Sequence, residues 1–149
     1  MKKMNPVVHF EMPADDTRRM AAFYSHVFGW EANFLGEEMG NYVTVSTSDT
    51  DENGMVKQPG AINGGIFPKN ENMPGNCPSL VIAVDDIHEH IKMVSEYGGQ
   101  VLGEPVNIPT IGLYVSFKDT EGNICSILQP VMTREQMSEV GQTGGTGEI

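Results

Sequence analysis

The chain opens with an alternation of apolar and polar residues that is typical of a β-strand. In the stretch VVHFEMPADD, two polar residues, His9 and Glu11, alternate with three apolar neighbours. These neighbours are Val8, Phe10 and Met12. Because successive side chains of a strand point to opposite faces, the apolar residues predict the face that packs on the core. We therefore expect His9 and Glu11 to share the opposite face, which borders water, a pocket or a metal.

A helix is expected next, and the whole strand–helix pattern returns further along the chain. Asp15 or Asp16 can cap a helix whose apolar residues recur with helical spacing before Gly29 ends it. These residues are Met20, Phe23, Tyr24 and Val27. In the second copy, SLVIAVDD predicts the strand, and Asp85 or Asp86 predicts the cap. Its apolar residues are Ile87, Ile91, Val94 and Tyr97, followed by Gly98 and Gly99.

Strand-like stretches follow each helix and complete two similar halves. These stretches are residues 41–47, 60–68, 112–119 and 123–130. The polar run SDTDENGMVKQPG lengthens the first half and is expected to form a surface loop. Either half alone would leave one face of its sheet exposed, so the repeat predicts two sheets that enclose a cleft. We expect one α+β domain, residues 1–130, made of modules 5–68 and 78–130.

The composition indicates which partners and which cellular location are expected. The chain has 9 Lys and Arg against 20 Asp and Glu, and its net charge of −11 disfavours nucleic acids and anionic membrane surfaces. Two cysteines, Cys77 and Cys125, are too few for a disulfide framework, and no signal or membrane-spanning segment stands out. We therefore expect a cytoplasmic protein. Residues 131–149 end in the glycine-rich GQTGGTGEI and are expected to form a flexible tail.

Four motifs connect the chain to a known family. They are HFEMPADDTRRMAAFYSHVFGW, the paired VDD and YGG, INGGIFP, and FKDTEGNICSILQP, and they cover most of the chain between Met4 and Pro130. In these motifs the chain resembles the vicinal oxygen chelate superfamily, which contains glyoxalase I, fosfomycin and bleomycin resistance proteins, and extradiol dioxygenases. The resemblance implies two tandem βαβββ modules that form a cleft-shaped, barrel-like mixed sheet with helices outside. It also implies a divalent metal, held in the cleft by the first and last strands of each module.

The metal positions implied by the resemblance contain few ligand residues. They fall on His9, Ser79, Gly64 (or its neighbour Gly65) and Ser126. Only His9 is of a ligand type, because serine and glycine do not replace the histidines and carboxylates that bind zinc, nickel or iron. Glu11 is the candidate for a second ligand. We therefore expect no metal and no other cofactor, and a metal that did bind would use His9 and Glu11.

Polar residues on other strands are expected to line the same cleft. Tyr42 and Thr44 share one strand face, and Tyr114 and Ser116 share another. Tyrosine rings with polar tips suit a small organic ligand. The consecutive glycines of INGGIFP indicate either a structural bulge or the close approach of a ligand. The expected ligand-binding residues are Tyr42, Thr44, Asn63, Gly64, Ser79, Tyr114, Ser116 and Ser126.

Two functions of different classes fit these residues. The first is a protein that binds a small organic molecule, like the drug-binding resistance proteins of the family, and needs neither a metal nor a catalytic group. The second is a glyoxalase-type lyase or isomerase, or a dioxygenase, in which His9 and Glu11 are the catalytic residues, with or without a divalent metal. A purely structural hydrogen-bond pair is the third interpretation of these two residues. We favour the binding protein, with a small organic molecule as its partner. The sequence leaves a homodimer and a monomer both open as its assembly.

Overall fold

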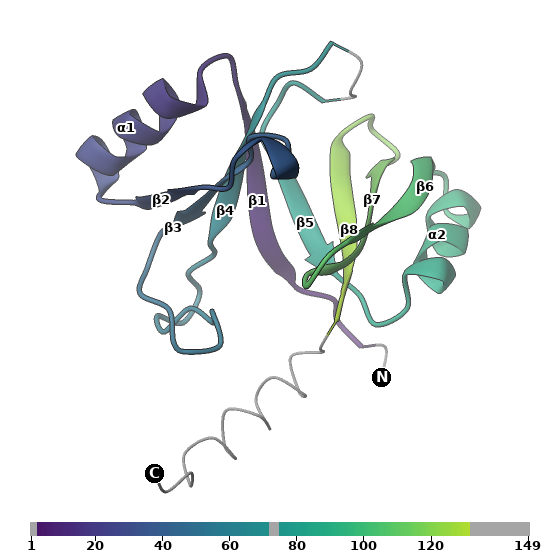
Figure 1. The fold of residues 1–149 in the computed structure, drawn as a ribbon. Coiled ribbons are helices and arrows are strands. Elements are labelled where there is room, and N and C mark those ends of the chain that lie inside the picture. The colour runs from purple at the N-terminus through teal and green to yellow at the C-terminus, as the bar shows by residue number, and fades with distance from the viewer. Residues whose placement is uncertain (1–2, 72–74, 132–149) are drawn as a thin grey trace, which may run out of the picture.

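An eight-stranded mixed sheet with an α-helix at each side makes up the computed structural model, which describes residues 3–71 and 75–131 (Figure 1). The first module contains β1 (Val7–Ala14), α1 (Thr17–Phe28), β2 (Glu31–Phe34), the short helix η1 (Glu37–Met39), β3 (Val43–Ser46) and β4 (Gly64–Pro68). The second module contains β5 (Ser79–Ala83), α2 (Ile87–Glu96), β6 (Gln100–Ile108), β7 (Gly112–Lys118) and β8 (Ile124–Pro130). The α+β fold with a repeated βαβββ order is therefore confirmed.

The two modules are joined through their first strands at the centre of the sheet. The strand order is β2-β3-β4-β1-β5-β8-β7-β6, in which β1 pairs with β5 antiparallel and with β4 parallel. In the second module β5 likewise pairs with β8 parallel. The expected two sheets are therefore one continuous sheet, because β1 and β5 pair directly. This sheet begins at β2 and ends at β6, so it is not closed into a barrel. The line of contact between β1 and β5 places residues of both modules side by side.

Both helices begin at the second aspartate of their Asp-Asp pair. The Asp16 side chain accepts a hydrogen bond from the backbone N–H of Arg19 at 3.0 Å, and Asp86 accepts from the N–H groups of His88 and Glu89. These bonds satisfy donors that a helix start otherwise leaves unpaired. Gly29 ends α1 with a φ of 73°, in the left-handed region that glycine adopts without strain.

The apolar strand residues pack beneath the helices, as the alternation predicted. The core of the first module is formed by Ala14, Ala21, Val43, Val45 and Ile66, with Phe10, Met20 and Trp30 against it. The core of the second module is formed by Val84, Ile87, Val115 and Ile127. Each module thus has its own apolar layer on the helix side of the common sheet.

Three apolar residues with the predicted helical spacing lie at the surface rather than against the sheet. Phe23 and Val27 on α1 are 55% and 56% exposed, and Tyr97 after α2 is 73% exposed. With about 3.6 residues per turn, Phe23 and Val27 lie on the far side of α1 from the buried Ala21. The helical spacing identified the helix correctly but not which apolar residues face the sheet.

The two edge strands, β2 and β6, carry no strand pattern in the sequence. All four residues of β2 are exposed, so no apolar face alternates with a polar one. Strand β6 contains Gly103 and Pro105, and its pairing with β7 is irregular between Leu102 and Val106. Strand β4 begins at Gly64, four residues later than expected. The predicted tail, apart from Val131, lies outside the described residues. Within the described ranges, no helix is long and apolar enough to cross a membrane.

Candidate functional site

The face of the sheet opposite the helices carries a connected set of polar side chains. Helix α1 packs on β2, β3 and β4, and α2 packs on β6, β7 and β8 (Figure 1). In the described part of the chain, neither of these two α-helices packs on the other side of the sheet. We call this side the inner face. Six of its side chains form one hydrogen-bonded group, the Glu11 network. They are His9, Glu11, Tyr42, Tyr114, Ser116 and Ser126.

The half of the network from the first module joins β1 to the residue before β3. The Tyr42 hydroxyl donates to Glu11 Oε2 at 3.1 Å and lies 2.8 Å from His9 Nε2. Because the only proton of the Tyr42 hydroxyl is directed to Glu11, His9 must donate its Nε2–H to the Tyr42 oxygen. This bond fixes the tautomer of a neutral His9, with the proton on Nε2.

The half from the second module reaches Glu11 from the other side. The Tyr114 hydroxyl donates to Glu11 Oε1 at 2.5 Å, and Ser126 Oγ donates to the Tyr114 hydroxyl at 2.7 Å. Ser116 Oγ lies 2.9 Å from Ser126 Oγ and must be its donor, because the Ser126 proton is already used. Ser126 is 1% exposed, and these bonds satisfy its buried hydroxyl.

All five bonds point toward the Glu11 carboxylate, which accepts one tyrosine hydroxyl on each oxygen. Burial and the nearby Glu11 charge raise the pKa values of Tyr42 and Tyr114 well above the ordinary tyrosine value. Burial lowers the pKa of His9 below its ordinary value, although Glu11 acts in the opposite direction. At neutral pH the network therefore contains two protonated tyrosines and an uncharged histidine.

The register between β1 and β4 shows that Gly65, rather than the expected Gly64, lies on the inner face. Glu11 is paired with Gly65, so Gly65 lies on the inner face. A Cβ added at Gly65 would lie 1.8 Å from the Tyr42 hydroxyl oxygen, which shows that the Tyr42 phenol fills this position. Gly64 points the other way, where an added Cβ would lie 2.4 Å from the Phe10 ring. The assignment of Gly64 to the ligand-binding face is therefore wrong, because Phe10 covers it on the helix side.

The residues at the implied metal positions do not fit a divalent metal. His9 Nε2 donates to Tyr42, and the Tyr42 ring occupies the space beside Gly65. Ser79 Oγ donates to the backbone oxygen of Ile124 at 2.9 Å, and Ser126 belongs to the Glu11 network. Across residues 3–71 and 75–131, no group of three His, Cys, Asp or Glu side chains is arranged to hold a metal ion.

Three further predicted residues lie near the network without joining it. Thr44 pairs with Gly65 across β3 and β4 and so lies on the inner face. Ser79 pairs with Glu11 across β5 and β1, but its hydroxyl is used by Ile124. Asn63 Oδ1 accepts the backbone N–H of Thr47 at 2.8 Å.

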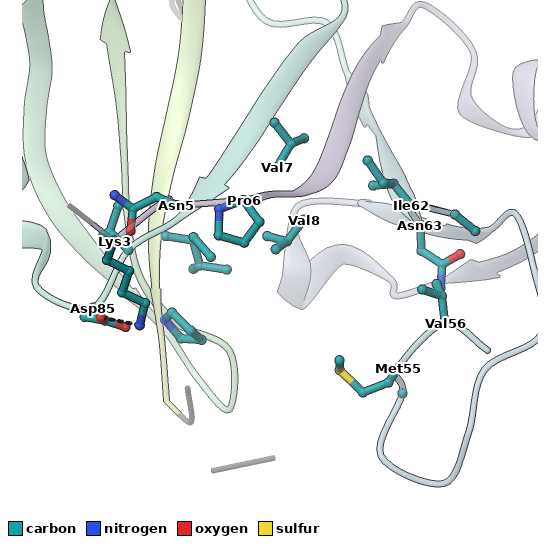
Figure 2. A pocket seen from close by; sticks show the side chains of 16 residues that line it. Lys3, Asn5, Pro6, Val7, Val8, Met55, Val56, Ile62, Asn63 and Asp85 are labelled. Atoms are coloured by element: carbon teal, nitrogen blue, oxygen red, sulfur yellow. Dashed lines mark hydrogen bonds and ion pairs between the residues drawn. The ribbon is translucent and has the colours of Figure 1, made fainter. Parts of the chain in front are cut away.

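Asn63 also lines a pocket at the end of the sheet where β1 begins and β8 ends (Figure 2). The pocket has a volume of about 230 Å³ and is lined by residues of both modules, including Val8, Val56, Ile62, Asn63, Ala83 and Leu128. Lys3 and Asp85 form an ion pair at 2.6 Å among its lining residues. Leu128 pairs with Tyr114, and Val8 precedes His9, so the pocket neighbours the Glu11 network along two strands. The sequence does not predict this pocket, because much of its lining comes from loops, whose residues have no periodicity.

Comparison with known sequences identifies the family. The family model described as Glyoxalase/Bleomycin resistance protein/Dioxygenase superfamily matches residues 7–127, so the chain belongs to this superfamily. A glyoxylase-like domain-containing protein of Didymella fabae is 33% identical over 120 residues, which cover 78% of this chain and 88% of that protein. The putative glyoxylase CFP32 of Mycobacterium bovis is 29% identical over 123 residues. This match covers 80% of our chain but only 42% of CFP32.

Solved structures show the same fold at low sequence identity. A methylmalonyl-CoA epimerase in complex with methylmalonyl-CoA and NH4+ superposes with a TM-score of 0.62 at 16% identity, covering 87% of this chain and 96% of that one. The Mycobacterium tuberculosis methylmalonyl-CoA epimerase gives a TM-score of 0.60 at 12% identity, covering 85% and 88%. At these identities the similarity concerns the fold, so function has to be argued from the site.

Proposed function

We propose that this protein binds a small organic molecule on the inner face, between its modules, without a divalent metal. The Glu11 network carries the proposal, because it places a carboxylate, two phenols and an imidazole on one partly exposed surface formed by both modules. A few fixed polar groups beside an apolar pocket are the usual composition of a small-molecule site. The polar part of the ligand contacts the network, and the neighbouring pocket takes an apolar part.

The position of Tyr42 supports binding without a metal. Its phenol occupies the place next to Gly65 where a last-strand carboxylate would have to stand. A glutamate side chain at residue 65 would require Tyr42 to leave the network, and the bonds to His9 and Glu11 would then be lost. The inner face is thus built around hydrogen bonds rather than around a metal-ligand set.

An enzyme is the second candidate, and one observation favours it. Glu11 lies between two phenol hydroxyls at 3.1 and 2.5 Å, an arrangement in which a carboxylate can take a proton from a bound substrate and return it. The names of the glyoxylase-like relatives agree with such a role. In this alternative Glu11 is the base and His9 positions Tyr42. Incubating bound molecules with the protein in D2O would detect this activity as enzyme-dependent deuterium incorporation.

A thermal-shift screen in the presence of EDTA tests the proposed binding function. The matched variants are Glu11→Gln in the network and Glu96→Gln on the exposed end of α2. We expect molecules that raise the Tm of the wild type and of Glu96→Gln but not of Glu11→Gln. Stabilisation that appears only after a divalent metal is added, or that is unchanged in Glu11→Gln, would contradict the proposal.

We also propose that the protein forms a homodimer and is located in the cytoplasm. A homodimer is supported by the exposed apolar side chains of α1, namely Phe23, Val27 and Phe28. Light scattering should give the mass of two chains for the wild type and of one chain for Phe28→Ser, and a monomeric wild type would exclude the dimer.

A cytoplasmic location is supported by two free cysteines, one of them exposed, since a reducing compartment keeps thiols in this state.

A further inference from the structure

Within residues 3–71 and 75–131, no cationic side chain is paired with the Glu11 carboxylate. Throughout the described ranges, no lysine or arginine forms an ion pair with Glu11, and the groups that contact it are the neutral hydroxyls of Tyr42 and Tyr114. His9, the nearest titratable base in the network, has a lowered pKa and supplies no charge at neutral pH. A partly buried carboxylate of this kind is held only by neutral hydrogen bonds, which are weaker than charge-assisted ones from a cation.

Glu11 also has acceptor capacity that the network does not use. A carboxylate offers about four lone-pair positions, and each Glu11 oxygen accepts one tyrosine hydroxyl. Glu11 is only partly buried, so a ligand can reach it from the inner face. The hydroxyls of Tyr42 and Tyr114 contact the carboxylate, so a cation bound to Glu11 lies close to two aromatic rings, which attract cations through their faces.

From these contacts we infer that the ligand carries a cationic nitrogen, as an amine, amidine or guanidine does, and that this group pairs with Glu11. The inference rests on the proposed function and names the chemical class that the site selects. An anionic ligand would meet both the Glu11 charge and a net charge of −11 on the chain. A cationic ligand instead supplies the missing counter-charge and is attracted over a longer range.

Three probes of nearly equal size and different charge test the inference. They are benzamidine, which is a cation, benzamide, which is neutral, and benzoate, which is an anion. Amide chemical shifts of the 15N-labelled, EDTA-treated protein report both the site and the Kd for each probe. We expect benzamidine to shift the amides around Glu11 and Tyr114 with a Kd at least tenfold below that of benzamide, and benzoate not to bind. Added salt should weaken benzamidine binding and leave benzamide binding unchanged.

Two variants test whether the preference for benzamidine comes from the Glu11 carboxylate. Glu11→Gln should raise the Kd of benzamidine about tenfold, which is the loss of roughly 1.4 kcal/mol, while Glu96→Gln should leave it unchanged. If benzamide binds the inner face as tightly as benzamidine, the cation inference is wrong and the small-molecule site stands. If none of the three probes shifts inner-face amides at millimolar concentration, the proposed function is contradicted as well. The comparison of probes on the wild type remains decisive even if Glu11→Gln does not fold.

Discussion

At the scale of single residues, a carboxylate organises the inner face. Tyr42 and Tyr114 keep their protons because burial and the neighbouring Glu11 charge raise their pKa values, and each hydroxyl donates to Glu11. Once these two donations are fixed, the directions of the remaining bonds, made by His9, Ser126 and Ser116, are fixed as well. The pKa shifts of both tyrosines and of His9 are consequences of the same partly buried position. Each shift predicts how the stability of the fold depends on pH.

The first residue-scale prediction concerns alkaline titration. Because the folded state raises the pKa values of Tyr42 and Tyr114, both stay protonated when an unfolded chain would ionise them, above about pH 10. Stability should therefore be lost as pH rises beyond that value. Tyrosinate absorbance should show late ionisation that coincides with alkaline unfolding, and Tyr114→Phe should remove one late-ionising group. The control Tyr97→Phe, at a site 73% exposed, should leave the late groups in place. Early ionisation of all tyrosines would contradict the network.

The second residue-scale prediction concerns mild acid. The folded state lowers the pKa of His9, so the unfolded chain takes up the proton first as pH falls below about 6.5. The free energy of unfolding should decrease in this range. His9→Gln keeps an N–H donor for Tyr42 and removes the titration, so its stability should depend less on pH in urea unfolding. His26→Gln, an exposed change on α1, should behave like the wild type. Equal pH dependence in all three proteins would show that His9 is not buried as described.

Sequence periodicity could place most of these residues on one face but not in contact. Alternation put His9 and Glu11 opposite Phe10, and Tyr42 opposite the buried Val43, because a strand has a period of two. The bond from Tyr114 to Glu11 spans 103 residues, and its existence depends on strand order and register, which alternation does not encode. Gly64 was misplaced because a glycine has no side chain whose polarity indicates a face.

At the scale of the elements, β4 and the segment before β3 fit closely around the network. Gly65 pairs with Glu11 on one side and with Thr44 on the other, and the Tyr42 phenol lies over it. Any side chain at residue 65 would displace this phenol. The double glycine of INGGIFP, which the sequence left open between a bulge and a ligand contact, thus accommodates two aromatic rings, one on each face of β4.

A double-mutant cycle tests this arrangement. Gly65→Ala should destabilise the fold by about 1–3 kcal/mol in urea unfolding, because its Cβ would lie 1.8 Å from the Tyr42 hydroxyl oxygen. In a Tyr42→Ala background the same substitution should cost much less, since the clashing ring is absent. Additive effects of the two substitutions would show that Tyr42 does not cover Gly65.

Edge elements were the least predictable from sequence. Exposed β2 lacks an apolar face, and β6 contains glycine and proline, so neither has the alternation by which the central strands were found. The helix starts were better determined, because Asp16 and Asp86 leave a capping signal directly in the sequence. The helices and the central strands could therefore be predicted from local sequence, through their caps and apolar faces. The edge strands could not, because they are defined by their pairing with a neighbouring strand.

At the scale of the whole molecule, the two modules share one sheet and one network. Strand β1 pairs with β4 of its own module and with β5 of the other, and Glu11 accepts bonds from both modules. The internal repeat predicted this two-module plan, while the open edges of the sheet became visible only in the structure.

Because β1 pairs with strands of both modules, we predict that the two modules unfold together. The single tryptophan, Trp30, lies against the core of the first module, so its fluorescence reports on that half. Amide signals of Val115 and Ile127 report on the core of the second half. Both probes should give the same urea midpoint, as expected for a single cooperative unit. Separate midpoints would mean that the β1–β5 pairing does not couple the modules.

The proposed function depends on where a ligand binds and on whether a metal is present. The most direct measurement is a crystal structure of the EDTA-treated protein with the most stabilising molecule from the thermal-shift screen. We predict that the molecule lies on the inner face within hydrogen-bond distance of Glu11, beside Tyr42 and Tyr114, with no metal ion in contact. A molecule bound elsewhere, or a metal bridging His9 and Glu11 to the ligand, would contradict the proposed function.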